Sequence, residues 1–201
     1  MGLTWLKNRL FLIGLAVAVA SFGGCKSSGG LGDIVALDET AEAGKIVEDA
    51  NKELNKIKVL YRDNEGKRLE IRQALEANNT AEVRRLAGEI VTIINEGTNL
   101  AADAIDKLES ARSMKINADY ERYLELKIDA LKSQLEAFQN FHKAARTLRD
   151  NYDPKDAAAR DKVKEEFEEL TEKYRKTMED ARARSSEAND LYKDTVRKER
   201  Q

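Results

Sequence analysis

The sequence predicts an all-α protein, an elongated antiparallel coiled-coil bundle of three long helices that occupies residues 37–201. Apolar or small residues recur every three or four positions over most of this region, as in helices that bury one seam. Charged residues make up 36% of the chain and aromatic residues only 6%. This composition suits long solvated helices with narrow apolar seams better than a deep globular core. The regular period also argues against disorder.

The first helix is expected to begin at Asp33 or Asp38, either of which can cap it, and to run to about Ala77. Acidic residues crowd its start and basic residues its second half, an order that complements the helix dipole. Gly66 and the gap in the apolar stripe around it mark a weak point. The seam of this helix consists of Ala43, Ile46, Val47, Ala50, Leu54, Ile57, Leu60, Tyr61, Ile71 and Leu75.

The second helix is the longest. Asn79, with Glu82 three residues later, has the spacing of a capping box. The apolar stripe then continues to Tyr152 without a proline, so one helix of roughly 100 Å is expected. A break near Ser113 to Asn117 would instead give a compact four-helix bundle, and this alternative stays open.

The third helix is expected to start with Asp153 as its cap, Pro154 at the first helical position and Asp156 in the first turn. Short turns on either side of the long helix make neighbouring helices antiparallel. This geometry places Tyr174 opposite Leu131. It also brings small residues of all three seams to one level: Ala43, Ala50, Ala104, Ala111, Ser185 and Ala188.

Residues 1–24 have the three parts of a signal peptide. Lys7 and Arg9 supply positive charge. The apolar run that follows, Leu10–Ala20, is too short to cross about 30 Å of hydrocarbon comfortably as a permanent helix. Small residues then lead up to Cys25, the only cysteine in the chain.

This leader resembles that of a bacterial lipoprotein precursor, with Gly23 and Gly24 matching the small residues before the lipidated cysteine. The resemblance implies cleavage between Gly24 and Cys25, and attachment to Cys25 of diacylglycerol and usually an amino-terminal acyl chain such as palmitate. Residues 25–36 would then hold the lipidated cysteine and a flexible glycine/serine tether. Lys26 stands where an aspartate would favour the inner membrane, so the resemblance implies the outer membrane, facing the periplasm.

Two other fates of the leader stay open. The triplet Ala18-Val19-Ala20 fits an ordinary signal-peptidase site, which would release a protein that begins at Ser21 with a free thiol. Alternatively, the apolar run could remain attached as an uncleaved anchor.

The sequence offers little that could carry chemistry. One cysteine and one histidine exclude an intrachain disulfide framework and the usual zinc sites. Gln139 stands three residues before His142, where a di-iron bundle needs glutamate. The acidic run Glu165–Glu169 is interpreted as a solvated helix face. Nucleotide-binding loops and activated serine motifs are missing, so we expect no enzyme, metal site or cofactor, and no small-molecule substrate is evident.

The partners expected are a membrane, through the lipid anchor, and a protein partner or a second copy of the chain. The formal charge of −2 does not suggest nucleic acid. These observations predict a lipid-anchored protein of the cell envelope that acts as a structural, spacer or protein-interaction element. The alternative is a ligand- or host-binding surface lipoprotein with a cleft between helices. A cleft should leave a hydrophobic pocket walled by aromatic residues, whereas a spacer should leave thin, filled seams.

Overall fold

The computed structural model describes residues 39–64 and 66–199. In this part of the chain there are α-helices and no strands, so the prediction of an all-α fold is confirmed. The helices are α1 (Thr40–Asp63), α2 (Lys67–Glu76), α3 (Thr80–Arg112), α4 (Ala118–Asn151) and α5 (Ala157–Glu199). The predicted signal peptide, Cys25 and the tether lie outside the described residues.

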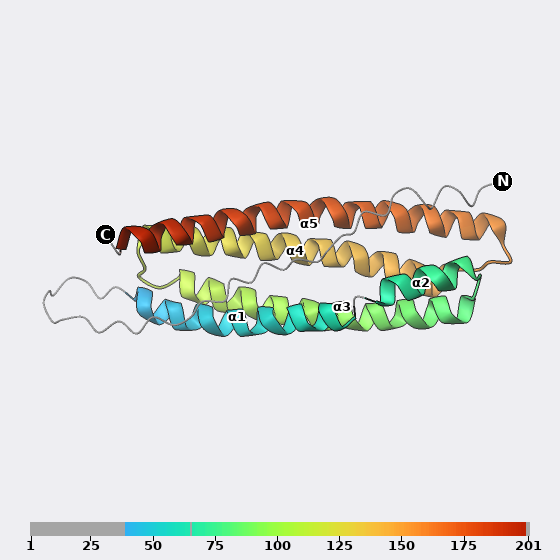
Figure 1. Cartoon of the computed structure of the whole chain (residues 1–201), viewed down its shortest axis with the longest axis horizontal. Helices are drawn as coiled ribbons and strands as arrows, with labels where there is room; N and C mark the ends of the chain where they lie inside the picture. The colour runs from blue at the N-terminus through green and yellow to red at the C-terminus, as the bar shows by residue number, and fades with distance from the viewer. Residues whose placement is uncertain (1–38, 65, 200–201) are drawn as a thin grey trace, which may run out of the picture.

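The helices lie side by side along one axis and form an elongated helical bundle (Figure 1). α1 and α2 follow one another along α3, α3 packs on α4, and α4 packs on α5. The chain reverses direction between α2 and α3, between α3 and α4, and between α4 and α5, so α1 and α4 run in the same direction. The longest helix, α5, has 43 residues and therefore spans about 65 Å.

The prediction of one continuous helix from Asn79 to Tyr152 is wrong. α3 ends at Arg112 and α4 begins at Ala118, with a short turn between them. Asn117 caps α4, because its Oδ1 atom accepts a hydrogen bond from the backbone N–H of Tyr120 at 2.8 Å.

The first described residues hold this α3–α4 turn in place. The backbone N–H of Glu39 donates to the carbonyl oxygen of Lys115 at 2.8 Å. The backbone N–H of Lys115 donates in return to Oε2 of Glu39 at 2.7 Å. The backbone N–H of Asn117 donates to Oγ1 of Thr40 at 3.3 Å. The start of α1 and the α3–α4 turn therefore lie at the same end of the bundle.

The expected first helix is divided in two, at the weak point marked by Gly66. Asn64 contributes to the end of α1, since its Nδ2 atom donates to the carbonyl oxygen of Leu60 at 2.8 Å. The two residues proposed as caps, Asp33 and Asp38, lie outside the described residues.

The turn between α2 and α3 follows its prediction. Asn78 has a φ of 51°, a left-handed conformation that asparagine adopts more readily than most residues. Asn79 then caps α3, its Oδ1 atom accepting from the backbone N–H of Glu82 at 3.2 Å. The predicted start of this helix is therefore confirmed.

The start of α5 lies later than predicted. Asp156, and not Asp153, caps the helix, because its Oδ1 atom accepts from the backbone N–H groups of Ala158 and Ala159 at 3.0 Å each. Asp153 instead accepts from the backbone N–H of Lys155 at 2.9 Å, within the loop before the helix.

This later start shifts α5 along α4. Tyr174 packs against Phe141, with ring centroids 5.2 Å apart, and not against Leu131 as the three-helix register predicted. The longer α4–α5 loop accounts for the direction of the shift.

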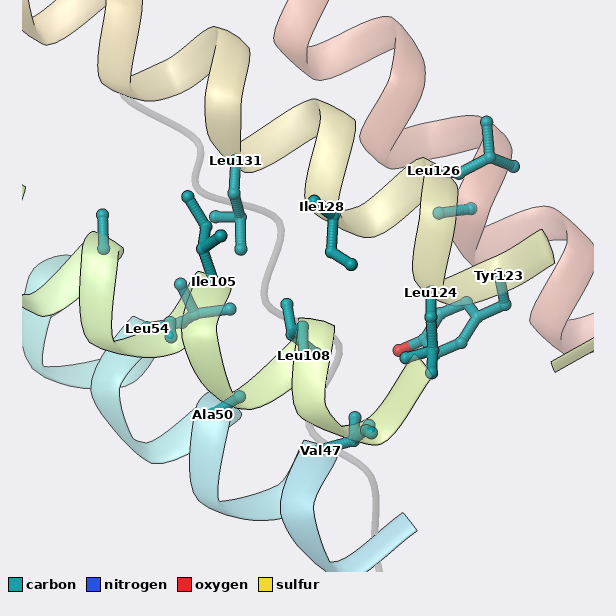
Figure 2. Close-up of a cluster of buried hydrophobic side chains, with 14 of the residues drawn as sticks. Val47, Ala50, Leu54, Ile105, Leu108, Tyr123, Leu124, Leu126, Ile128 and Leu131 are labelled. Atoms are coloured by element: carbon teal, nitrogen blue, oxygen red, sulfur yellow. The ribbon is translucent and has the colours of Figure 1, made fainter. Parts of the chain in front are cut away.

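The core has two clusters of buried apolar side chains, one toward each end of the bundle. Figure 2 shows the cluster nearer the α3–α4 turn, where side chains of α1, α3 and α4 meet. Small residues of three helices, α1, α3 and α5, belong to this cluster: Ala43, Ala50, Ala104, Ala111 and Ala188. These five residues share one cluster, whereas Ser185, which is predicted at the same level, does not belong to it.

Candidate functional site

The strongest candidate site is a group of polar and aromatic side chains between α1, α4 and α5, which we call the tyrosine–lysine cluster. It consists of Asn51 of α1, Tyr120, Tyr123 and Lys127 of α4, and Tyr192 of α5. The three α4 residues are spaced by three and four positions, which places them on one face of the helix. The cluster therefore lies within the first turns of α4, near the end of the bundle where α1 begins.

α1 and α4 lie in the same register along the length of this cluster. A Cβ atom at Gly44 would lie 3.9 Å from the hydroxyl oxygen of Tyr120. Seven residues further along both helices, the Lys127 Nζ atom donates to Oδ1 of Asn51 at 2.8 Å. Both pairs are 76 positions apart in the sequence, as expected for two helices that run in the same direction.

The three tyrosine rings lie in a row, with Tyr120 stacked on Tyr123 and Tyr192 tilted against Tyr123. The centroids of Tyr120 and Tyr123 are 5.6 Å apart, and those of Tyr123 and Tyr192 are 5.3 Å apart. Tyr123 is only 2% exposed, and its side chain extends from α4 into the bundle (Figure 2). The Lys127 Nζ atom lies 5.5 Å from the centroid of this ring, within the range of a cation–π contact.

The charges in the cluster follow from its burial. Burial lowers the pKa of the Lys127 ammonium to about 8, so the group is still mostly charged at neutral pH. Burial raises the pKa of Tyr120 to about 12, with smaller effects from Tyr192 and Glu48. Burial also raises the pKa of Tyr123 above its ordinary value. Both phenols therefore keep their protons over the physiological range and can act as hydrogen-bond donors.

Lys127 differs from other lysines that link two helices. Lys67 donates to Glu89, Lys107 to Glu53 at 3.2 Å, and Lys132 to Glu109 at 2.7 Å. Each of these ammonium groups has a carboxylate partner. Lys127 donates instead to the Asn51 amide and to the Tyr123 hydroxyl oxygen, the latter at 3.1 Å. Its positive charge is therefore held by neutral oxygen atoms.

The site residues predicted from the sequence do not include any member of this cluster. Gly24 and Cys25, the predicted cleavage and lipidation positions, lie outside the described residues. In the acidic run, Glu165 is exposed and Glu166 accepts a hydrogen bond from Oγ1 of Thr147 at 3.2 Å. Within the described ranges, the structure brings no three histidine, cysteine, aspartate or glutamate side chains together as a metal site.

His142 is half-buried, and its Nε2 atom is buried without a hydrogen-bond partner. The pKa of His142 is lowered by burial and, to a smaller extent, by the positive charges of Arg146 and Arg149. Thr171 of α5 also has a buried hydroxyl oxygen without a partner. A low pKa favours the neutral imidazole, as expected for a side chain in an apolar seam.

The sequence contains one signal for the cluster. Tyr123 and Lys127 share one face of the helix with Tyr120, which belongs to the apolar stripe. A lysine on a seam-facing stripe marks a charge that needs a partner. The partners from α1 and α5 are distant in the sequence, so the local pattern does not name them.

The described part of the chain is thus a helical bundle with filled apolar seams and a partly buried ammonium group, that of Lys127, beside tyrosine rings. Comparison of the whole chain with protein-family models, with curated proteins and with solved structures finds no match in any of the three.

Proposed function

We propose that this chain is a lipid-anchored protein of the cell envelope whose bundle acts as a structural, spacer or protein-interaction element. The observation that supports this role most directly is the position of Glu39, bonded to the α3–α4 turn at one end of the bundle. A tether from Cys25 would therefore join the bundle at its end. The opposite turns lie at the far end, and α5 alone is about 65 Å long.

The packing of the bundle supports a spacer over a protein with a ligand cleft. Both core clusters are filled by aliphatic and aromatic side chains from several helices. An open groove of about 450 Å³ runs beside α1, and its lining contains no aromatic residue. It is lined by Lys52, Asn55, Lys56, Val59, Leu60, Asp63, Asn64 and Glu96. This groove lacks the aromatic walls expected of the ligand-binding alternative.

We propose a compact four-helix arrangement, in which α1 and α2 together form one column beside α3, α4 and α5. The break between α3 and α4 and the order of helix packing support it. Small-angle scattering of the chain can test this arrangement. A cross-section for four helices and a length set by α5 are expected, whereas a thinner rod of roughly 100 Å would favour three long helices.

The membrane attachment is proposed to be through lipid on Cys25. Among the described helices, none has the length and apolar character needed to cross a bilayer. Acyl chains contribute about 0.8 kcal/mol per buried CH₂, so several chains hold a protein stably on a bilayer. Cys25→Ala should move the protein from the membrane fraction to the soluble fraction, whereas Ser27→Ala should leave it in the membrane fraction.

Mass spectrometry of the purified protein provides the direct test. An amino-terminal Cys25 with the added mass of acyl chains is expected. An unmodified Cys25, or a mature protein that begins at Ser21, would contradict the anchor. The outer membrane is proposed from Lys26 and is tested separately, because Lys26→Asp should shift the protein to inner-membrane fractions on a density gradient.

A further inference from the structure

We propose that two copies of this chain associate through the open groove beside α1, here called the α1 groove, with the two α1 helices antiparallel. Residues of α1 between Lys52 and Asn64 line this groove together with Glu96 of α3. Such a pair deepens the protein-interaction role and rests on that part of the proposed function. The lipid anchor is tested by Cys25→Ala, so its failure is distinguishable from a failure of the chains to associate.

The centre of the α1 groove is apolar and exposed. Val59 is 44% exposed and lies beside Leu60, which is half-buried. Among the described residues, Leu69 is the other large apolar side chain that stands exposed, and it lies on α2, outside the groove lining. Single exposed apolar residues are ordinary on protein surfaces, so the case for an interface depends on the charges around Val59.

These charges are segregated along the groove. Lys52 and Lys56 precede Val59 on α1, and Asp63 follows it. The spacing of three and four positions places the four residues on one face of the helix. Along α1 the groove therefore has a basic end, an apolar centre and an acidic end.

Glu96 of α3 adds a second carboxylate to the acidic end. Its neighbour Gly97 faces Tyr61, which is only two positions before Asp63. Glu96 is exposed and lines the same groove. The basic and acidic ends thus differ on both helices that border the groove.

This order of charges is complementary to itself. A twofold axis between Val59 and Leu60 places Lys56 of each copy opposite Asp63 of the other, while the apolar residues meet at the axis. A parallel pair would set like charges against one another, which is costly. The antiparallel contact uses the same patch of both copies and therefore closes as a dimer.

The charged side chains of the groove can turn to a second copy at little cost. Lys56 lies 2.8 Å from Glu53, and Asp63 lies 2.9 Å from Arg62. Lys56, Asp63 and Arg62 are exposed, and ion pairs at exposed positions contribute little to stability. Glu53 also accepts from Lys107 at 3.2 Å, so it keeps a cation when Lys56 turns away.

The size of the α1 groove predicts a weak dimer. From Lys52 to Asn64 the groove extends about 18 Å along the helix. Stable dimers bury about 800 Å² on each partner, more than a single helix contact of this length supplies. The pair would hold its two Glu39 residues at opposite ends, roughly 60 Å apart, and so would separate the two tethers.

Light scattering of the full chain in detergent tests the association, with the protein mass determined separately from the detergent mass. Because the dimer is weak, the protein concentration is varied from about 10 µM to about 1 mM. The mean protein mass should rise from that of a monomer toward that of a dimer. Added salt should lower the mass at a given concentration, because salt screens exposed ion pairs.

Two substitutions of an apolar residue by an acidic one locate the interface. Val59→Asp brings two carboxylates together at the twofold axis and should weaken the association about tenfold or more. Leu69→Asp makes a similar change at the other exposed apolar side chain and should associate as the unmodified chain does. Circular dichroism of both variants shows whether the helices are retained.

An exchange of charges tests the antiparallel pairing. Lys56→Glu and Asp63→Lys should each weaken the association about tenfold, because like charges then face each other on both sides of the axis. The double variant restores opposite charges and should associate as the unmodified chain does. Lys58→Glu makes the same change of charge at an exposed position of α1 outside the groove lining and should have little effect.

Several results would overturn the proposal. The protein mass could stay that of a monomer at the highest concentration. Leu69→Asp or Lys58→Glu could weaken the association as much as the groove variants do, which would place the contact elsewhere. A folded double variant that associates no better than Lys56→Glu alone would exclude the antiparallel pairing.

Discussion

The ring of Tyr61 in α1 lies directly against Gly97 in α3, so that a Cβ atom at Gly97 would stand 2.7 Å from the Tyr61 hydroxyl oxygen. Two ring carbons of Tyr61 would be 3.2 Å from the same Cβ atom. The ring also stacks on Phe138 of α4, with centroids 4.9 Å apart. Tyr61 is therefore confined between α3 and α4, and the absence of a side chain at Gly97 allows it to enter.

Gly97→Ala should destabilise the protein although alanine favours helices. Because the Tyr61 ring cannot move aside without losing its stack on Phe138, we expect the free energy of unfolding to fall by about 1–3 kcal/mol. Chemical denaturation followed by circular dichroism measures this change. Gly88→Ala is the matched control, since its Cβ would lie 3.7 Å from Cδ of Arg149, an ordinary contact. In Gly88→Ala, the higher helix propensity of alanine should raise the free energy of unfolding by up to about 1 kcal/mol. Equal effects of the two substitutions would contradict the confinement of Tyr61.

Ala111→Leu should also destabilise, because Ala111 is completely buried among small residues of other helices. A larger side chain forces these helices apart, at an expected cost of about 1–3 kcal/mol in unfolding free energy. Ala102→Leu, on the exposed face of the same helix, should change stability little. Thermal and urea unfolding of the two variants give the comparison. A neutral Ala111→Leu would mean that the helices do not meet at this level.

Because of Lys127, the free energy of unfolding should depend on pH in the alkaline range. The pKa of Lys127 is about 8 in the folded chain, against an ordinary 10.5, so the folded state releases this proton first as pH rises. Unfolding free energy should therefore increase by about 1–2 kcal/mol between about pH 8 and about pH 9.5. Urea unfolding of the unmodified chain and of Lys127→Met over this pH range measures the effect. The increase should be absent in Lys127→Met. Tyr120, with a pKa of about 12, contributes in the opposite sense only at higher pH.

His142 should make the free energy of unfolding depend on pH in the acidic range. Its pKa lies below the ordinary 6.5, so the unfolded state takes up the proton first as pH falls. Stability should therefore be lost as pH decreases through about 6.5. His142→Leu removes a buried nitrogen without a partner and should be neutral or slightly stabilising at neutral pH, with a flatter acid dependence. The raised pKa of Glu168 acts in the reverse sense in both proteins, so the difference between them isolates the contribution of His142. The same acid dependence in both proteins would assign it to another group.

The helical periods and several helix ends could be predicted from the sequence, because these features depend on residues within a few positions of one another. Asn79 reaches the backbone of Glu82 three residues away, and the break at Gly66 coincides with a gap in the apolar stripe. The burial of Ala111 likewise follows from the seam to which it belongs. A seam fixes which face of a helix is buried wherever the period is regular.

Only the tertiary structure decided where the long apolar stripe is interrupted and what meets Lys127. The stripe allows a continuous helix through residues 113–117, and the turn there is held by Glu39 and Thr40, more than seventy positions away. Asn51 reaches Lys127 across the same sequence separation. Apolar periodicity records that a face is buried but not which helix covers it, because burial of apolar area is non-directional. The polar contacts that select one neighbour form only after the helices have packed.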